Sequence, residues 1–167
     1  NRVRNTQIIQ QAKELNSLLL EKNVRSVFLK GTGNLLEDLY KDVGERMVGD
    51  IDFIVSNEDS LKSHEILMNN GYKIKTNEST FSDFRHFPRL IKSTQIAAVE
   101  IHKELFIEKF PHELNYELIN KKVLKINNVN VLSFEHQLAL SIIADQINDN
   151  GFYYKTMALR NAYDVFL

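Results

Sequence analysis

The chain has 167 residues, 43% of them hydrophobic and 26% charged, which is ordinary globular usage and enough length to bury the core of one domain. Its net charge of −1 gives no overall field that would draw it to nucleic acid or to a membrane surface. It has no cysteine, which excludes disulfides, thiolate metal sites and a cysteine nucleophile, and fits a cytoplasmic protein. No apolar run reaches the about 18 residues that a membrane span needs, so no membrane partner is expected.

Apolar side chains recur every three or four positions along residues 3–21, which predicts an N-terminal helix. Residues 24–29 are an apolar run typical of a short buried strand, and the glycine-containing sequence at 30–33 ends it. A second helix is expected at residues 34–40, followed by a polar turn at residues 41–46. The order of strand, glycine turn and helix brings backbone N–H groups to a place where a phosphate could bind.

Asp50 and Asp52 stand one residue apart at the start of an apolar strand predicted at residues 50–55. Side chains alternate along a strand, so both carboxylates point to the same face. Carboxylates so close repel one another, and a protein keeps them together mainly when a cation bridges them. Oxygen ligands on a rigid strand suit Mg²⁺ or Mn²⁺. The pair therefore predicts a metal-dependent phosphoryl- or nucleotidyl-transfer site, the alternative being two acids that keep an exposed strand edge soluble.

Residues 57–70 have the apolar spacing of a third helix, and Gly71 provides a stop for it. The alternating segments 72–76, 80–91 and 96–105 are each predicted to be strands. They would add further strands to the sheet that contains the two aspartates.

Residues 112–119 are expected to form a short helix, and residues 123–131 a hairpin that turns at Asn127-Asn128. From residue 133 the pattern becomes helical, with helices predicted at residues 133–148 and from residue 154 to the end.

This order predicts an α+β fold with two parts. Residues 1–132 would form a mixed β-sheet flanked by helices, and residues 133–167 would begin a helical C-terminal subdomain. The sequence lacks an initial methionine and stops inside a helical pattern, so we expect a truncated chain.

Four further residues are candidates for the same site. Glu100 lies on a predicted neighbouring strand, where its carboxylate could complete a metal site or act as a general base. His102 would share the face of Glu100, either touching substrate or standing as a half-buried polar residue. Lys30 could add positive charge at the phosphate turn or be a solvated lysine. Arg46 could reach phosphate or pair with an acid on the surface.

Together these segments resemble the nucleotidyltransferase superfamily, the fold of DNA polymerase β, and most closely its bacterial branch with a Lys-Gly turn, an arginine, Asp-x-Asp and Glu-x-His. The matching segments are Phe28-Leu29-Lys30-Gly31, residues 36–40, Arg46, residues 50–55, Val99-Glu100-Ile101-His102, residues 133–138 and residues 159–165. His86 stands where relatives have a histidine before the third acid. Most of the superfamily carries Gly-Ser at the phosphate turn, whereas this sequence has Lys30-Gly31-Thr32-Gly33.

The resemblance implies a role for each part of the site. The catalytic acids, which would also bind two Mg²⁺ (or Mn²⁺) ions, are Asp50, Asp52 and Glu100. The nucleotide phosphates would be held by Lys30, Gly31, Thr32, Gly33 and Arg46. Candidate substrate contacts are His86, His102, Lys155 and Arg160.

The expected activity is transfer of a nucleoside monophosphate from an NTP, such as ATP, to a hydroxyl of a small molecule, a protein or an RNA end. A small molecule or a protein is favoured, because nucleic-acid binding normally needs a basic stripe. Two alternatives stay open: a catalytically inactive module that binds nucleotide or a partner, and a plain α+β interaction domain. The mutually repelling acids favour the enzyme over the inactive module.

Overall fold

The computed structural model describes residues 1–75, 85–107 and 114–167. Its helices are α1 (Arg2–Leu20), α2 (Lys30–Leu36), α3 (Asn57–Asn69), α4 (Tyr116–Asn120), α5 (Phe134–Asn148), α6 (Gly151–Tyr154) and α7 (Leu159–Phe166). Its strands are β1 (Val27–Phe28), β2 (Ile51–Ile54), β3 (Lys73–Ile74), β4 (Leu90–Ile91), β5 (Val99–His102), β6 (Val123–Ile126) and β7 (Val129–Leu132). Among the described residues, no helix is long and apolar enough to span a bilayer.

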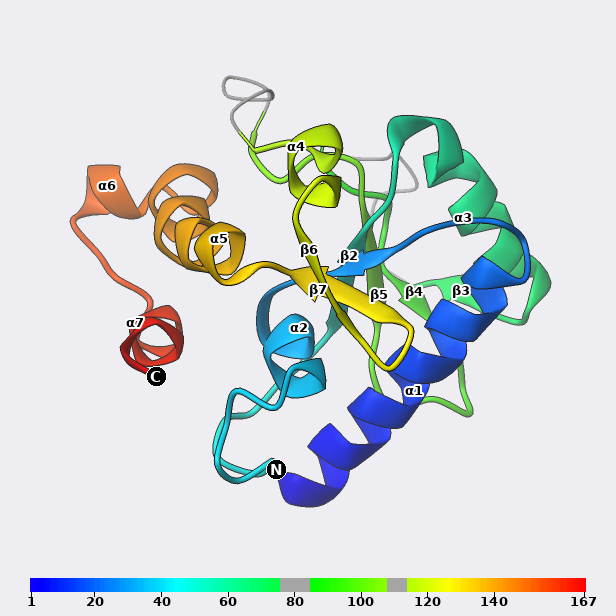
Figure 1. Cartoon of the computed structure of the whole chain (residues 1–167), viewed down its shortest axis with the longest axis horizontal. Helices are drawn as coiled ribbons and strands as arrows, with labels where there is room; N and C mark the ends of the chain where they lie inside the picture. Colours follow the sequence, from blue (N-terminus) through cyan, green and yellow to red (C-terminus); the bar gives the residue numbers. More distant parts are fainter. Residues whose placement is uncertain (76–84, 108–113) are drawn as a thin grey trace.

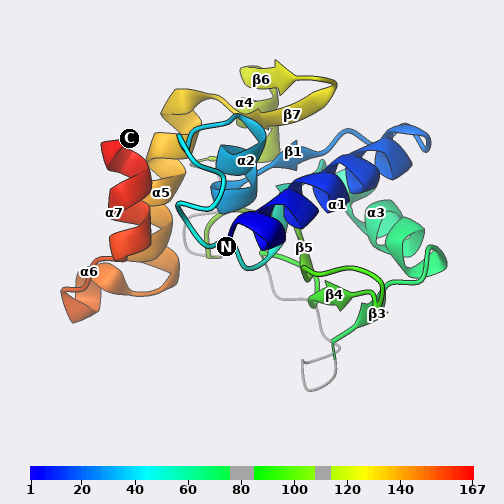
Figure 2. The same cartoon turned by 90° about the horizontal axis from the view of Figure 1, so that it is seen from below.

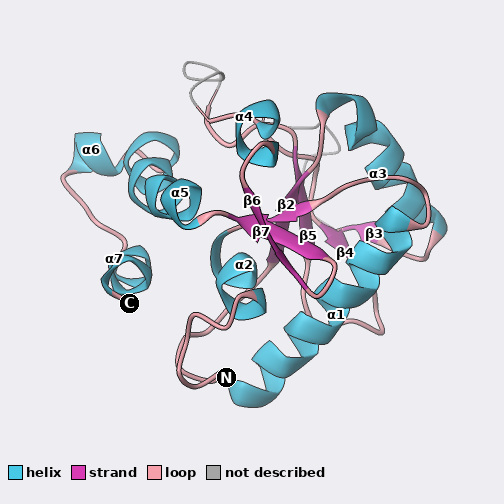
Figure 3. Cartoon of the chain, in the orientation of Figure 1, coloured by secondary structure: helices cyan, strands magenta, loops and turns pink. Residues whose placement is uncertain are grey.

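The strands form one mixed sheet in the order β3-β4-β5-β2-β1-β7-β6, with helices around it (Figure 3). The pairs β2–β5 and β1–β7 are parallel, and the other neighbouring strands are antiparallel. All residues of β2 and β5 are buried, as expected for a parallel pair with both faces covered. The predicted α+β fold, a mixed sheet flanked by helices and followed by C-terminal helices, is confirmed.

Two apolar clusters lie against this sheet. The larger one joins Ile51 and Phe53 of β2 to the inward faces of α1, α2 and α3, and α1 lies across the strands in Figure 2. The smaller one joins Ile54 to side chains of α4 and α5. Because side chains alternate along β2, Asp52 faces the same side as Ile54, toward the C-terminal helices.

The C-terminal helices α5, α6 and α7 stand together at one end of the molecule (Figure 1). Leu140 of α5 belongs to the smaller apolar cluster, so this helix packs against the sheet rather than standing apart from it. The division of the chain near residue 132 stays a prediction.

Helix α2 differs from the sequence-based expectation. It begins at Lys30 instead of residue 34, because the N–H of Gly33 already donates to the carbonyl of Leu29 at 3.0 Å. It ends at Leu36 instead of residue 40, because Asp38 adopts a left-handed conformation with φ of 61°. The glycine sequence that was expected to form a turn is therefore the first turn of a helix.

Several strands are shorter than predicted, because only part of each apolar segment is hydrogen-bonded to a neighbouring strand. Residues 76–84 and 108–113 lie outside the described residues, and with them parts of the strands expected at 72–76 and 80–91 and of the helix expected at 112–119. The hairpin turn at Asn127-Asn128 is confirmed, with positive φ at both asparagines. The last helix starts at Leu159 rather than at residue 154, because Lys155 is left-handed and stops α6.

Candidate active site

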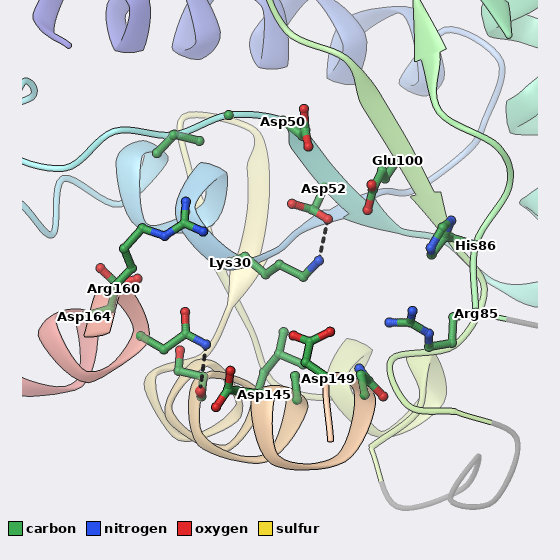
Figure 4. Close-up of a pocket in the computed structure, with 18 of the residues that line it drawn as sticks. Lys30, Asp50, Asp52, Arg85, His86, Glu100, Asp145, Asp149, Arg160 and Asp164 are labelled. Atoms are coloured by element: carbon green, nitrogen blue, oxygen red, sulfur yellow. Dashed lines mark hydrogen bonds and ion pairs between the residues drawn. The ribbon is translucent and has the colours of Figure 1, made fainter. Parts of the chain in front are cut away.

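Two of the predicted catalytic acids lie side by side on the central parallel strands. Asp52 of β2 is paired in register with Glu100 of β5, and their exposed fractions are only 8% and 6%. Asp50 precedes β2 by one residue and is half-buried. Figure 4 shows the three carboxylates on one side of a pocket. Strand alternation and strand pairing together bring these acids to one face.

A lysine and a histidine meet the same oxygen of Asp52. The Lys30 ammonium is 2.6 Å from Oδ1, and His102 Nε2 is 2.9 Å from it. His102 Nε2 is also 3.6 Å from Oε2 of Glu100. One donor atom from each of Asp52, Glu100 and His102 lies within 4.8 Å of the others, and all three side chains are buried. This is a compact set of potential metal ligands.

The charges around the acids set their pKa values. Burial alone would raise the pKa of Asp52, but the Lys30 ammonium and the hydrogen bond from His102 outweigh it and hold this pKa well below its usual range. The pKa of Glu100 is lowered too, because its bonds to His102 and Arg89 and the charge of Lys30 overcome burial and the repulsion of Asp52. Burial raises the pKa of Asp50, with repulsion from the other two acids, and the charge of Arg89 only partly opposes this. Two of the three acids are therefore ionised well below neutral pH.

Sequence reasoning missed Arg89, which joins two of these acids. Its guanidinium contacts Glu100 through Nε and lies 3.4 Å from Asp50 Oδ2 through Nη2. It stands directly before β4, the neighbour of β5, which carries the side chain to the acids. The available signal was indirect, since buried carboxylates require a cationic partner.

Of the four residues predicted to form the phosphate turn, 30–33, two line the pocket and the other two are buried outside its lining. Lys30 and Gly31 line the pocket, next to Arg46. Thr32 is fully buried, and its hydroxyl donates to the carbonyl oxygen of Asp50 at 3.0 Å. Gly33 packs on β1, where an added Cβ would come within 3.1 Å of the Phe28 carbonyl oxygen. Thr32 thus ties α2 to the start of the acid-bearing strand, and Gly33 allows α2 to lie close to β1.

Thr32→Val provides a test of this placement. Losing the hydroxyl leaves the Asp50 carbonyl without this donor, so we expect the free energy of unfolding to fall by about 1 kcal/mol. If Thr32 does not contact phosphate, the KM for NTP stays within about twofold of the wild-type value. Urea unfolding measures the stability, and transfer rates at increasing NTP concentration measure the KM. A large rise in KM in a stably folded Thr32→Val protein would show that the hydroxyl does contact phosphate.

The pocket beside the acids has a volume of about 350 Å³. Its opposite wall is the polar face of α5, with Asp145 and Asp149 across from the acids (Figure 4). Its remaining charged residues are Lys30, Arg46, Arg85, Arg89, Arg160 and Asp164. The lining residues of α5, such as Ser141, Asp145 and Asn148, recur every three or four positions. This spacing in the sequence could have indicated a polar helix face. The pocket carries mixed charge rather than a uniform basic field.

Arg46 anchors the last helix. Its Nε lies 2.9 Å from Asp164 Oδ1, and the Tyr40 hydroxyl donates to the same oxygen at 2.9 Å. The two side chains of the ion pair are 12% and 5% exposed. Burial raises the pKa of Asp164, although the Arg46 charge and the Tyr40 bond oppose this. Arg46, which was predicted to bind phosphate, thus also links the loop before β2 to α7.

Asp164→Ala should loosen α7, because it leaves the Arg46 guanidinium buried without its carboxylate. Breaking one side of a buried pair costs on the order of 3 kcal/mol. We expect the amides of α7 to exchange hydrogen on the order of a hundredfold faster, measured by mass spectrometry. Glu135→Gln, which breaks the exposed pair with Lys122, is the control and should change exchange little. Unchanged protection of α7 would show that this pair does not hold the helix.

The remaining predicted contacts differ in position. His86 and Arg160 line the pocket. The ring of His86 stands edge-on to that of His102, with centroids 5.4 Å apart. Lys155 instead places its ammonium 4.3 Å from the centroid of the exposed Phe152 ring, and it is not among the described residues that line the pocket.

A mixed sheet with flanking helices, followed by C-terminal helices, places this structure in the class of nucleotidyltransferase-like folds. In agreement, the structure is similar to the crystal structure of a presumed nucleotidyltransferase from Thermotoga maritima, with a TM-score of 0.60 and 18% identity over 87% of this chain and 89% of that one. The chain belongs to the family described as uncharacterised nucleotidyltransferase, whose family model matches residues 1–167. Comparison with curated proteins gives no match. The resemblance inferred from the sequence is confirmed.

Proposed function

We propose that the protein is a metal-dependent nucleotidyltransferase that moves a nucleoside monophosphate from an NTP to an acceptor hydroxyl. The observation that carries this proposal is the in-register pair of buried carboxylates, Asp52 and Glu100, beside a pocket that also contains Lys30 and Arg46. Membership of a nucleotidyltransferase family supports the same reaction class. We further propose a cytoplasmic setting, in keeping with the absence of cysteine, and a bacterial source, in keeping with the resemblance to the bacterial branch of the superfamily.

The donor chemistry of the site fits a divalent cation. Asp52, Glu100 and Asp50 would hold it, because their carboxylates repel one another at this spacing and hard oxygen ligands suit Mg²⁺ or Mn²⁺. The ionised state of Asp52 well below neutral pH suits a ligand as well. When bound, such ions lower the pKa of an acceptor hydroxyl and compensate the charge of the triphosphate.

The chain's own cations would act on the phosphates. Lys30 and Arg46 both line the pocket, where they would neutralise charge that develops on the triphosphate as the acceptor attacks. Gly31 leaves room there, since an added Cβ would approach Arg46 to 2.5 Å. Arg89 already binds Asp50 and Glu100, so we assign it the role of holding these carboxylates in position.

The acceptor is proposed to be a small molecule or a protein side chain rather than a long RNA. The pocket interleaves acids such as Asp145 and Asp149 with its arginines, and a nucleic-acid backbone favours a continuous basic surface. His86 and Arg160 are the proposed substrate contacts that line this pocket. The ammonium of Lys155, which was also predicted to contact substrate, lies over the exposed Phe152 ring and not among the described residues of this pocket.

The test is incubation of the protein with each α-³²P-labelled NTP, a divalent cation and cell lysate, followed by separation of protein, RNA and metabolites. We expect label on one fraction, abolished by a chelator and restored by added metal. Glu135→Gln, which changes an exposed acid that is not among the described residues lining the pocket, should label as wild type does. Tight NTP binding without any transfer would favour the alternative, an inactive nucleotide-binding module.

A further inference from the structure

His102 has the position of a metal ligand rather than of a surface or substrate-binding residue. It is 2% exposed, and it follows Glu100 by two positions on β5, so both side chains leave the strand on the side of Asp52. Its Nε2 faces the carboxylates of Asp52 and Glu100. The other ring nitrogen, Nδ1, is buried and has no hydrogen-bond partner in the described part of the chain. In the described part of the chain, the polar contacts of this ring are therefore made through Nε2.

The distances suit shared coordination. Ligands that occupy neighbouring positions around an ion at about 2.1–2.2 Å lie about 3.0 Å apart, and opposite ligands lie about 4.3 Å apart. His102 Nε2 is 2.9 Å from Asp52 Oδ1, close to the spacing of neighbouring ligands, and 3.6 Å from Glu100 Oε2, between the two values. The set is two carboxylate oxygens and one imidazole nitrogen.

An imidazole ligand changes which ion the site prefers. Mg²⁺ is bound almost entirely through oxygen and loses its water reluctantly, whereas transition metals accept imidazole nitrogen readily. Mn²⁺ combines this tolerance with the affinity for carboxylates that the rest of the site supplies. We propose that His102 is a ligand of the catalytic ion and makes the site select Mn²⁺ over Mg²⁺. This rests on the proposed function, because it concerns the ion that the acids would hold.

The contact has another interpretation, in which Nε2 carries a proton and only orients Asp52 by a hydrogen bond. In that case His102 never touches the ion, and its loss affects Mn²⁺ and Mg²⁺ equally. Binding of Mn²⁺ can be followed without activity, because the paramagnetic ion reports nitrogen nuclei in its first coordination sphere through ¹⁴N modulation of its electron spin echo.

The experiment uses the full chain with Mn²⁺, in the presence and absence of a non-hydrolysable NTP analogue. We expect ¹⁴N modulation in wild type, lost in His102→Gln and His102→Asn but kept in His86→Gln and in the control His64→Gln. His64 packs on the Phe87 ring and does not line the pocket in the described part of the chain. By titration, His102→Gln should weaken Mn²⁺ binding about tenfold or more and Mg²⁺ binding less than about threefold.

The outcomes separate this inference from the function on which it rests. Wild-type Mn²⁺ binding that needs Asp52 but shows no ¹⁴N modulation would overturn the role of His102 and leave the proposed transferase intact. No metal binding, with or without the nucleotide analogue, would overturn both. If the His102 variants do not fold, the wild-type spectrum and that of His86→Gln decide together: modulation kept in His86→Gln supports His102, and modulation lost in it assigns the nitrogen to His86 and overturns the proposal.

Discussion

Asp52→Asn is expected to lower the rate of nucleotide transfer by a factor on the order of a thousand or more while the protein stays folded. The amide has the size of the carboxylate but lacks its charge, so it binds a divalent ion far more weakly. A thousandfold loss corresponds to about 4 kcal/mol of transition-state stabilisation, a reasonable contribution for an acid that holds a catalytic ion. Label incorporation from the NTP that the wild type uses measures this effect.

The matched control for Asp52→Asn is Glu135→Gln, which removes an acid from an exposed ion pair with Lys122. It should transfer nucleotide at the wild-type rate. Circular dichroism would show that Asp52→Asn is folded. Full transfer by the folded Asp52→Asn protein would mean that the chemistry takes place elsewhere or that the activity comes from a contaminant.

The three acids of the site could be predicted from the sequence because the direction of each side chain follows from its position along a strand. Asp50 and Asp52 share a face through the period of two along a strand, and Glu100 shows the same pattern within an apolar run. The register that sets Asp52 beside Glu100 is a property of the sheet, because it depends on β2 and β5 being parallel neighbours and cannot be derived from either segment alone. The mixed fold followed from the same patterns.

The rest of the site depends on tertiary contacts that no local pattern encodes. Arg89 reaches two acids because β4 neighbours β5, and Asp145 lines the pocket because Leu140 fixes α5 on the sheet. The family resemblance implied a phosphate contact for Thr32, in a segment, residues 30–33, that was expected to be a turn. Once these residues become the first turn of α2, its hydroxyl faces the acid strand instead.

Lys30→Met is expected to lower the transfer rate by about a hundredfold or more. Methionine keeps the length and apolar stem of lysine but cannot neutralise phosphate charge, and removing one such electrostatic contact typically costs this much. Lys122→Met, which removes a lysine from an exposed pair, is the control. If Lys30 serves only to balance Asp52, the rate at saturating metal and NTP will stay within a few-fold of wild type, which contradicts a phosphate role.

The same substitution should alter stability in a pH-dependent way when no metal is added. Breaking a buried pair costs about 3–5 kcal/mol, and the 41% exposure of the Lys30 side chain reduces this to about 2 kcal/mol at pH 7. Lys30 helps to hold the pKa of Asp52 below its unfolded value, so it stabilises the fold above about pH 4, and this contribution is lost as the pH falls through the folded pKa. The difference in unfolding free energy between wild type and Lys30→Met should therefore narrow as the pH falls below about 4, measured by urea unfolding. An equal difference at pH 7 and at low pH would mean that the lysine stem stabilises the fold by packing, and not by its charge beside Asp52.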